Sequence, residues 1–209
     1  MLSKEYVSSE IIVPLIYRKY MKEQLDRLEE LRNERIIYVT DLVSCSHKLK
    51  LRRLYPELSL RFEPGAVIGN LIHAGLEEIL SEEGYQVEYP VERGFEVNGV
   101  EYILKGRVDA FHPEKKLVVE IKSSRDTQNK PHEHHVYQLQ VYLNLLEVDK
   151  GILIYITPDG FLEYSVEREK INIKALIKTL VNDEIHPRWS WECRYCLFRR
   201  ICSYAYVEK

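Results

Sequence analysis

Gly106-Arg-Val-Asp-Ala-Phe-His-Pro-Glu-Lys-Lys-Leu-Val-Val-Glu-Ile-Lys122 is the stretch of sequence that decides the fold. A polar turn at residues 112–116 separates two apolar, β-branched runs, which is typical of an antiparallel hairpin. Side chains two residues apart share one face of a strand, so Glu120 and Lys122 point the same way. The turn then brings Asp109 opposite Glu120, or within one residue of it.

Two carboxylates held side by side repel each other unless a cation sits between them. Hard oxygen ligands in this arrangement suit Mg²⁺ or Mn²⁺. A neighbouring lysine could orient a water nucleophile or neutralise charge on a phosphate. The hairpin therefore predicts metal-assisted phosphodiester hydrolysis. The alternative is a surface hairpin with an ordinary aspartate and a Glu–Lys pair, but charges inside apolar strands are costly when unpaired, which favours the catalytic interpretation.

The rest of the chain is predicted to form helices and strands around this hairpin. The expected helices cover 15–35, 42–54 with Thr40 and Asp41 as caps, 65–84 with an apolar face of Ile68, Ile72, Leu76 and Ile79, 134–146 and 171–185. The expected strands include a hairpin at Asn98-Gly99 and a pair at 151–157 and 161–166. This order predicts an α/β or α+β fold with helices packed on a sheet.

Composition limits the function classes. The chain has 209 residues with 30 Lys and Arg against 33 Asp and Glu, a net charge of −3, so it is no general polycation that binds nucleic acid by bulk charge. No run is long enough to span a membrane and none resembles a secretory signal. We therefore expect a single domain in the cytoplasm, without a membrane partner.

A histidine upstream of the hairpin could complete a metal shell. His73 lies one helical turn after Gly69, at the border of the apolar face. A lone histidine there is more often a structural residue, but a neutral imidazole could join Asp109 and Glu120 on a metal ion. Gly69 would allow another backbone or a DNA strand to approach closely.

The helix after the hairpin carries Gln138 and Tyr142 one turn apart. They either reflect simple amphipathicity or direct polar tips toward a bound strand near the lysine. His132, His134 and His135 precede them, and we interpret these histidines as solvated or in contact with phosphate.

The four cysteines indicate a metal or cluster site. Cys193, Cys196 and Cys202 are closely spaced near the C-terminus, and Cys45 stands far upstream. In a reducing compartment, four thiolates would hold tetrahedral Zn²⁺ or an iron–sulfur cluster rather than form disulfides. Spacing alone leaves zinc and iron open.

Basic and aromatic residues surround these cysteines. They are Arg188, Arg194, Arg199 and Arg200 with Trp189, Trp191, Tyr195 and Phe198, and, near Cys45, Lys48, Lys50, Arg52 and Arg53. Such residues can hold a single strand by charge and stacking. The equally weighted alternative is a solvated helix face and a small aromatic core.

The ordered set of motifs is specific. A cysteine, G-x3-H, G-x-x-D, E-x-K, Q-x3-Y and C-x2-C-x5-C, from about Thr40 to Cys202, resembles the RecB-like nucleases of the PD-(D/E)xK superfamily with an iron–sulfur cluster. The absence of a helicase region makes the chain similar to the CRISPR-associated exonuclease family, the fourth of the Cas proteins. The corresponding division is one nuclease domain over 1–209, with a helical extension at 1–39, a nuclease core at 40–185 and a cysteine region at 186–209.

This resemblance implies a mixed sheet flanked by helices and an explicit set of roles. The implied metal ligands are His73, Asp109, Glu120 and the carbonyl of Ile121; Lys122 would be the catalytic lysine, Gln138 and Tyr142 would complete the site near DNA, and Cys45, Cys193, Cys196 and Cys202 would hold a 4Fe–4S cluster. It further implies exonuclease cleavage of single-stranded DNA and processing of new spacers with the CRISPR integrase proteins. Three questions stay open: a homo-oligomeric state, a non-catalytic DNA-end binding role, and a place in replication, repair or a virus.

Overall fold

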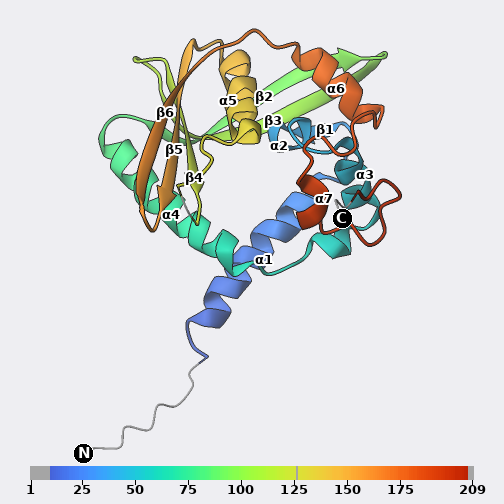
Figure 1. Ribbon diagram of the computed structural model, residues 1–209, viewed down its shortest axis with the longest axis horizontal. Coiled ribbons are helices and arrows are strands. Elements are labelled where there is room, and N and C mark those ends of the chain that lie inside the picture. Colours follow the sequence, from blue (N-terminus) through green and yellow to red (C-terminus); the bar gives the residue numbers. More distant parts are fainter. Residues whose placement is uncertain (1–9, 126, 207–209) are drawn as a thin grey trace, which may run out of the picture.

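The computed structural model describes residues 10–125 and 127–206, built on one six-stranded sheet (Figure 1). The strands are β1 Ile36–Tyr38, β2 Gln86–Val97, β3 Val100–His112, β4 Leu117–Ser123, β5 Lys150–Thr157 and β6 Gly160–Glu167. Their order is β1-β3-β4-β5-β6, with β2 also paired to β3. The pairs β1–β3 and β4–β5 are parallel and the others antiparallel, so the predicted mixed sheet is confirmed.

Helices lie on both sides of this sheet. They are α1 Val13–Glu30, α2 Val39–Leu42, α3 Ser46–Leu54, the 3-10 helix Pro56–Ser59, α4 Pro64–Glu82, α5 Glu133–Leu146, α6 Ile173–Val181 and α7 Glu192–Tyr195. The fold prediction of a sheet flanked by helices is therefore confirmed. None of the described helices is both long enough and apolar enough to cross a membrane.

The long β2–β3 hairpin forms where the sequence predicts it. Asn98 and Gly99 have φ values of 53° and 76°, which a two-residue hairpin turn requires at both central positions. Pairing then runs from Val97 opposite Val100 to Gln86 opposite Phe111. This hairpin carries the strand that reaches the candidate site.

Strand β3 changes partner along one edge. Near its start, residues 103–105 pair with β1, and near its end, residues 110–112 pair with β4. Between them, residues 106–109 have no partner strand on that edge in the described part of the chain. We call this interval the β3 fork. Asp109 lies at the fork.

Two apolar clusters pack against the two faces of the sheet. The larger one joins Val118, Leu153 and Tyr155 to buried residues of α5 and α6. The smaller one joins Ala110, Val119 and Ile121 to Leu76 and Leu80 of α4, which lies along strands β4 to β6 (Figure 1). Alternation along β4 thus sends Val119 and Ile121 toward α4, and Val118 and Glu120 toward the other face.

The structure corrects several sequence expectations. The helix expected at 42–54 is divided into α2 and α3, and Thr40 and Asp41 lie within α2. Asp41 nevertheless accepts a hydrogen bond from the backbone N–H of Tyr38 at 3.1 Å, as a capping residue does. The apolar face expected on α4 is only partly buried, because Ile68 and Ile79 are 59% and 58% exposed. The last long helix ends at Val181, earlier than expected.

Candidate active site

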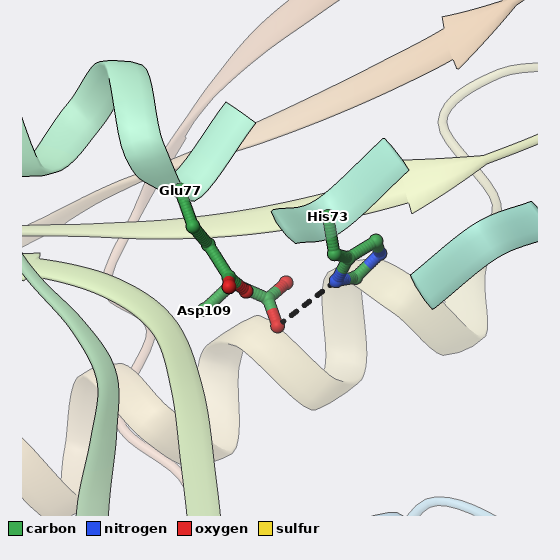
Figure 2. A group of neighbouring side chains, drawn as sticks. All are labelled: His73, Glu77 and Asp109. Carbon is green, nitrogen blue, oxygen red and sulfur yellow. Dashed lines mark ion pairs between the residues drawn. The ribbon is translucent and has the colours of Figure 1, made fainter. Parts of the chain in front are cut away.

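Helix α4 and strand β3 bring three possible metal ligands together. His73, Glu77 and Asp109 each offer one ligand atom, and these atoms all lie within 4.8 Å of one another. Figure 2 shows His73 and Glu77, one helical turn apart on α4, directed toward Asp109 of β3. The Nδ1 atom of His73 is 3.4 Å from Oδ1 of Asp109. The predicted proximity of His73 and Asp109 is thus present, and Glu77 joins them.

Asp109 is fixed at the fork by the neighbouring strand. Its Oδ2 accepts a hydrogen bond of 2.6 Å from the backbone N–H of Ile121. The last paired residues of β3 and β4 are Ala110 and Val119, so Asp109 and Glu120 are the next residues along each strand. The expected juxtaposition of Asp109 with Glu120 follows from this register.

Glu120 and Lys122 form a buried ion pair. Their side chains share one face of β4, with Nζ of Lys122 2.8 Å from Oε2 of Glu120. Glu120 is 1% exposed, and its other oxygen, Oε1, has no hydrogen-bond partner. A buried carboxylate oxygen without a partner is costly in an apolar strand. A divalent cation is a suitable partner for it, so the residues present fit a metal site.

Burial and charge act against each other in this pair. Burial raises the pKa of Glu120, while the Lys122 ammonium opposes that increase. Burial would lower the pKa of Lys122, but the Glu120 and Asp109 carboxylates outweigh burial and raise it. Lys122 is therefore held as an ammonium.

The pKa values of His73 and Glu77 are both raised in this site. Burial would lower the pKa of His73, but its contact with Asp109 outweighs burial and raises it. Burial, followed by the charges of Glu88 and Asp109, raises the pKa of Glu77. The site carries an excess of carboxylates that a cation would relieve.

Gln138 and Tyr142 of α5 are placed differently from each other. Gln138 accepts a hydrogen bond of 3.3 Å from Nζ of Lys122, so it lies beside the predicted catalytic lysine. Tyr142 is buried, and its hydroxyl donates to the carbonyl of Arg107 at 3.0 Å and accepts from the Arg107 N–H at 3.3 Å. These are backbone groups of the fork that lack a partner strand. The Tyr142 hydroxyl is therefore hydrogen-bonded to the backbone of the sheet.

Gly69 lies where another part of the chain approaches, which is one of its two expected roles. A Cβ atom at Gly69 would lie 3.0 Å from Oγ of Ser123. Gly69 thus allows α4 to approach the end of β4 closely.

Two of the three histidines before Gln138 are not solvated, although solvation was one of the two expected alternatives. His134 and His135 belong to α5 and are partly buried. Burial lowers the pKa of His134 to about 4 and that of His135 to about 2. Nδ1 of His135 is 2.8 Å from the Tyr155 hydroxyl, and the His134 ring lies 4.7 Å from that of Trp191. Both rings are therefore neutral packing groups.

The C-terminal segment, residues 185–206, is attached to the loop that bears Cys45. Trp189 donates from Nε1 to the carbonyl of Val43 at 2.8 Å, and the carboxylate of Glu192 accepts from the Cys45 N–H at 2.9 Å. All four cysteines line one cavity of about 260 Å³. Burial, together with the nearby charges of Glu192 and Cys196, raises the pKa of Cys45 to about 11. The four cysteines that the sequence assigns to one metal or cluster site therefore line one cavity.

The basic and aromatic residues divide into two sets. Arg52 pairs with buried Asp41 at 2.9 Å, Arg53 donates to backbone carbonyls, and Phe198 is buried. These residues support the fold. The exposed set, which we call the Trp191 surface, consists of Trp191, Arg194, Tyr195, Arg199 and Arg200.

Comparison with known proteins agrees with this fold and site. The sequence pattern of the PD-(D/E)XK nuclease superfamily matches residues 81–203. The CRISPR-associated exonuclease Cas4 of Saccharolobus solfataricus (strain P2) is 38% identical over 201 residues, which cover 92% of this chain and 98% of that protein. The crystal structure of SSO0001 has a TM-score of 0.88 at 36% identity, covering 95% of this chain and 99% of that one.

The acidic pair and the lysine at the strand fork suit metal-assisted phosphodiester chemistry. The chain belongs to the PD-(D/E)XK nuclease superfamily and, within it, to the family of the CRISPR-associated exonuclease Cas4. This membership confirms the prediction of a nuclease enzyme.

Proposed function

We propose that this protein is a divalent-metal-dependent exonuclease that cleaves single-stranded DNA. The observation that carries the proposal is the buried Glu120, whose Oε1 has no partner while Oε2 pairs with Lys122. An unpaired buried oxygen beside an ammonium costs stability, and a catalytic site gives a reason for it.

The residues have separable tasks in this proposal. His73, Asp109 and Glu120, with the Ile121 carbonyl, would hold Mg²⁺ or Mn²⁺, which supplies Lewis acidity toward the phosphodiester and its attacking water. Lys122 is oriented by Glu120 and Gln138, at 2.8 and 3.3 Å. Its ammonium is placed to stabilise negative charge that develops on the phosphate.

The Trp191 surface supports a single strand as the substrate. Trp191 and Tyr195 are 42% and 70% exposed, and Arg194 lies 5.7 Å from the Tyr195 ring centre. Exposed aromatic rings next to arginines can stack bases and bind phosphates. Trp191, His134 and Gln138 line the same cavity, so this surface is continuous with the residue that contacts Lys122.

Digestion of end-labelled DNA tests the activity. With Mn²⁺, the wild type is expected to shorten single-stranded DNA from an end, to cut duplex DNA more slowly, and to be inactive in EDTA. Glu120→Gln, which keeps the shape of the side chain, is expected to lose at least about a hundredfold in rate. Cleavage that persists in EDTA, or in Glu120→Gln at the wild-type rate, contradicts the proposal.

We further propose that the four cysteines hold a 4Fe–4S cluster. Four sulfurs on one Zn²⁺, each about 2.3 Å from the metal, lie about 3.8 Å apart. Among the described residues, no three cysteine sulfurs lie within 4.8 Å of one another, and the four line a cavity of about 260 Å³. This wider spacing favours a cluster over a single ion.

Anaerobic purification tests the cluster proposal. A brown protein with about four irons per chain supports it. A colourless protein that contains stoichiometric zinc contradicts it. The matched variants are Cys196→Ser, expected to lose the colour, and the exposed Ser203→Ala, expected to keep it.

We also propose that the protein processes spacer DNA together with the CRISPR integrase proteins, because the Cas4 relative is CRISPR-associated. Co-purification with the integrase proteins encoded beside its gene supports this partner. Separate elution at micromolar concentrations contradicts it. Light scattering on the same sample gives the oligomeric state.

A further inference from the structure

Glu77 is the acidic residue of the site that sequence motifs do not include. It follows His73 by one helical turn, and both side chains point from α4 toward Asp109 (Figure 2). The next residue, Glu78, is exposed to solvent. Two adjacent glutamates on one helix therefore have different surroundings, and only Glu77 faces the sheet.

The spacing of Glu77, His73 and Asp109 matches a shared cation. Their ligand atoms all lie within 4.8 Å of one another. Two ligands on opposite sides of a Mg²⁺ or Mn²⁺ ion are about 4.2 Å apart and adjacent ligands are closer, since each bond is about 2.1 Å. A small adjustment of side chains would thus place all three on one ion. Glu120 is not a member of this close group.

Two carboxylate oxygens of the site lack partners. Oε1 of Glu77 is buried and makes no hydrogen bond. On the opposite side of Asp109, the 1% exposed Glu120 also keeps Oε1 without a partner. Asp109 is attached to both sides, since it contacts His73 through Oδ1 and the backbone of Ile121 through Oδ2. The unpartnered oxygens are suited to a bound cation.

We propose that Glu77 is a ligand of the divalent cation, together with His73 and Asp109. This rests on the proposed function, because it assigns one more ligand to the same metal-dependent site. The expected consequence is a site with three carboxylates and one imidazole, in which Glu77 strengthens cation binding.

Titration of the purified full-length chain with Mn²⁺, with free Mn²⁺ measured by electron paramagnetic resonance, tests the assignment. Glu77→Gln is expected to weaken Mn²⁺ binding at least about tenfold, since even the loss of a residue that supports a ligand has an effect of this size. Glu78→Gln, the matched control, is expected to bind as the wild type does. Asp109→Asn is expected to lose binding.

The outcomes separate this inference from the proposed function. Wild-type affinity in Glu77→Gln, with binding lost in Asp109→Asn, overturns the role of Glu77 and leaves the nuclease site intact. Absence of Mn²⁺ binding in the wild type overturns both. If Glu77→Gln loses its helical circular dichroism, Glu77→Asp decides instead: weakened binding supports the inference, and unchanged binding overturns it.

Discussion

Two buried glutamates show how differently the two functional regions are built. Glu120 lies on a regular strand, and one of its oxygens has no partner. Glu192 begins the short helix α7 of the C-terminal segment, and both of its oxygens are engaged: Oε1 accepts from the Cys45 N–H, and Oε2 from the N–H groups of Arg188 and Trp189 at 2.8 and 3.0 Å. The strand therefore holds an acid that is available for chemistry, whereas the C-terminal segment uses one to hold the chain together.

This difference separates activity from stability. At the nuclease hairpin the sheet supplies the geometry, so its side chains can remain incompletely paired. The C-terminal segment lacks a sheet and is joined to residues 43–45 by side chains. Just before this segment, Asp183 adds a contact of 2.6 Å to His47. None of these hydrogen bonds involves a cysteine sulfur.

The largest expected contrast in stability is between the two glutamates. Glu192→Ala should lower the free energy of unfolding by about 3 kcal/mol, because it leaves three backbone N–H groups without their charged acceptor. Glu120→Gln should cost less, since its amide oxygen can still accept from Lys122 and the Asp109 carboxylate still acts on the ammonium. Urea unfolding of both variants measures the difference. A larger loss in Glu120→Gln would reverse the roles assigned to these residues.

A smaller loss of stability is expected from a substitution at the β3 fork. A Cβ atom at Gly106 would lie 2.6 Å from the ring of Tyr142 and 2.8 Å from Val39. Gly106→Ala should therefore destabilise the protein by about 1–3 kcal/mol through overpacking. The control is Gly75→Ala on α4, where the new methyl meets nothing within 4 Å and should be neutral or stabilising. Equal stability of the two variants would refute the packing of Tyr142 against the fork.

A further expected effect is a dependence of stability on acid. The pKa values of His134 and His135 are lowered from 6.5 to about 4 and about 2, so the unfolded chain binds more protons below pH 6.5 than the folded chain does. Stability should therefore be complete above pH 6.5 and decrease as the pH falls toward 4. Urea unfolding across this range measures the slope, which should be shallower in His134→Gln/His135→Gln. An unchanged slope in that variant would contradict the assignment.

The hairpin was predictable because its signals are local. Alternation and the turn placed Asp109 next to Glu120 without knowledge of the rest of the chain. Glu77 was overlooked, although its spacing from His73 indicates a shared helix face, because the sequence does not show which face meets the sheet. The bond from Cys45 to Glu192 and the pairing of the short strand β1 with β3 depend on partners distant in sequence, so no local pattern predicts them. The bonds of the Tyr142 hydroxyl to Arg107 could not be predicted, because they depend on the strand register that leaves residues 106–109 without a partner strand on one edge.

The cleavage rate of Lys122→Ala on single-stranded DNA, at saturating Mn²⁺ and with enzyme in excess, tests the central claim most directly. The account predicts a loss of at least about a hundredfold with the cluster colour retained, and Lys174→Ala, an exposed lysine on α6, should cleave as the wild type does. Circular dichroism confirms that the variant is folded, since breaking a buried pair also lowers stability. Cleavage by folded Lys122→Ala at the wild-type rate would contradict the assignment of the active site.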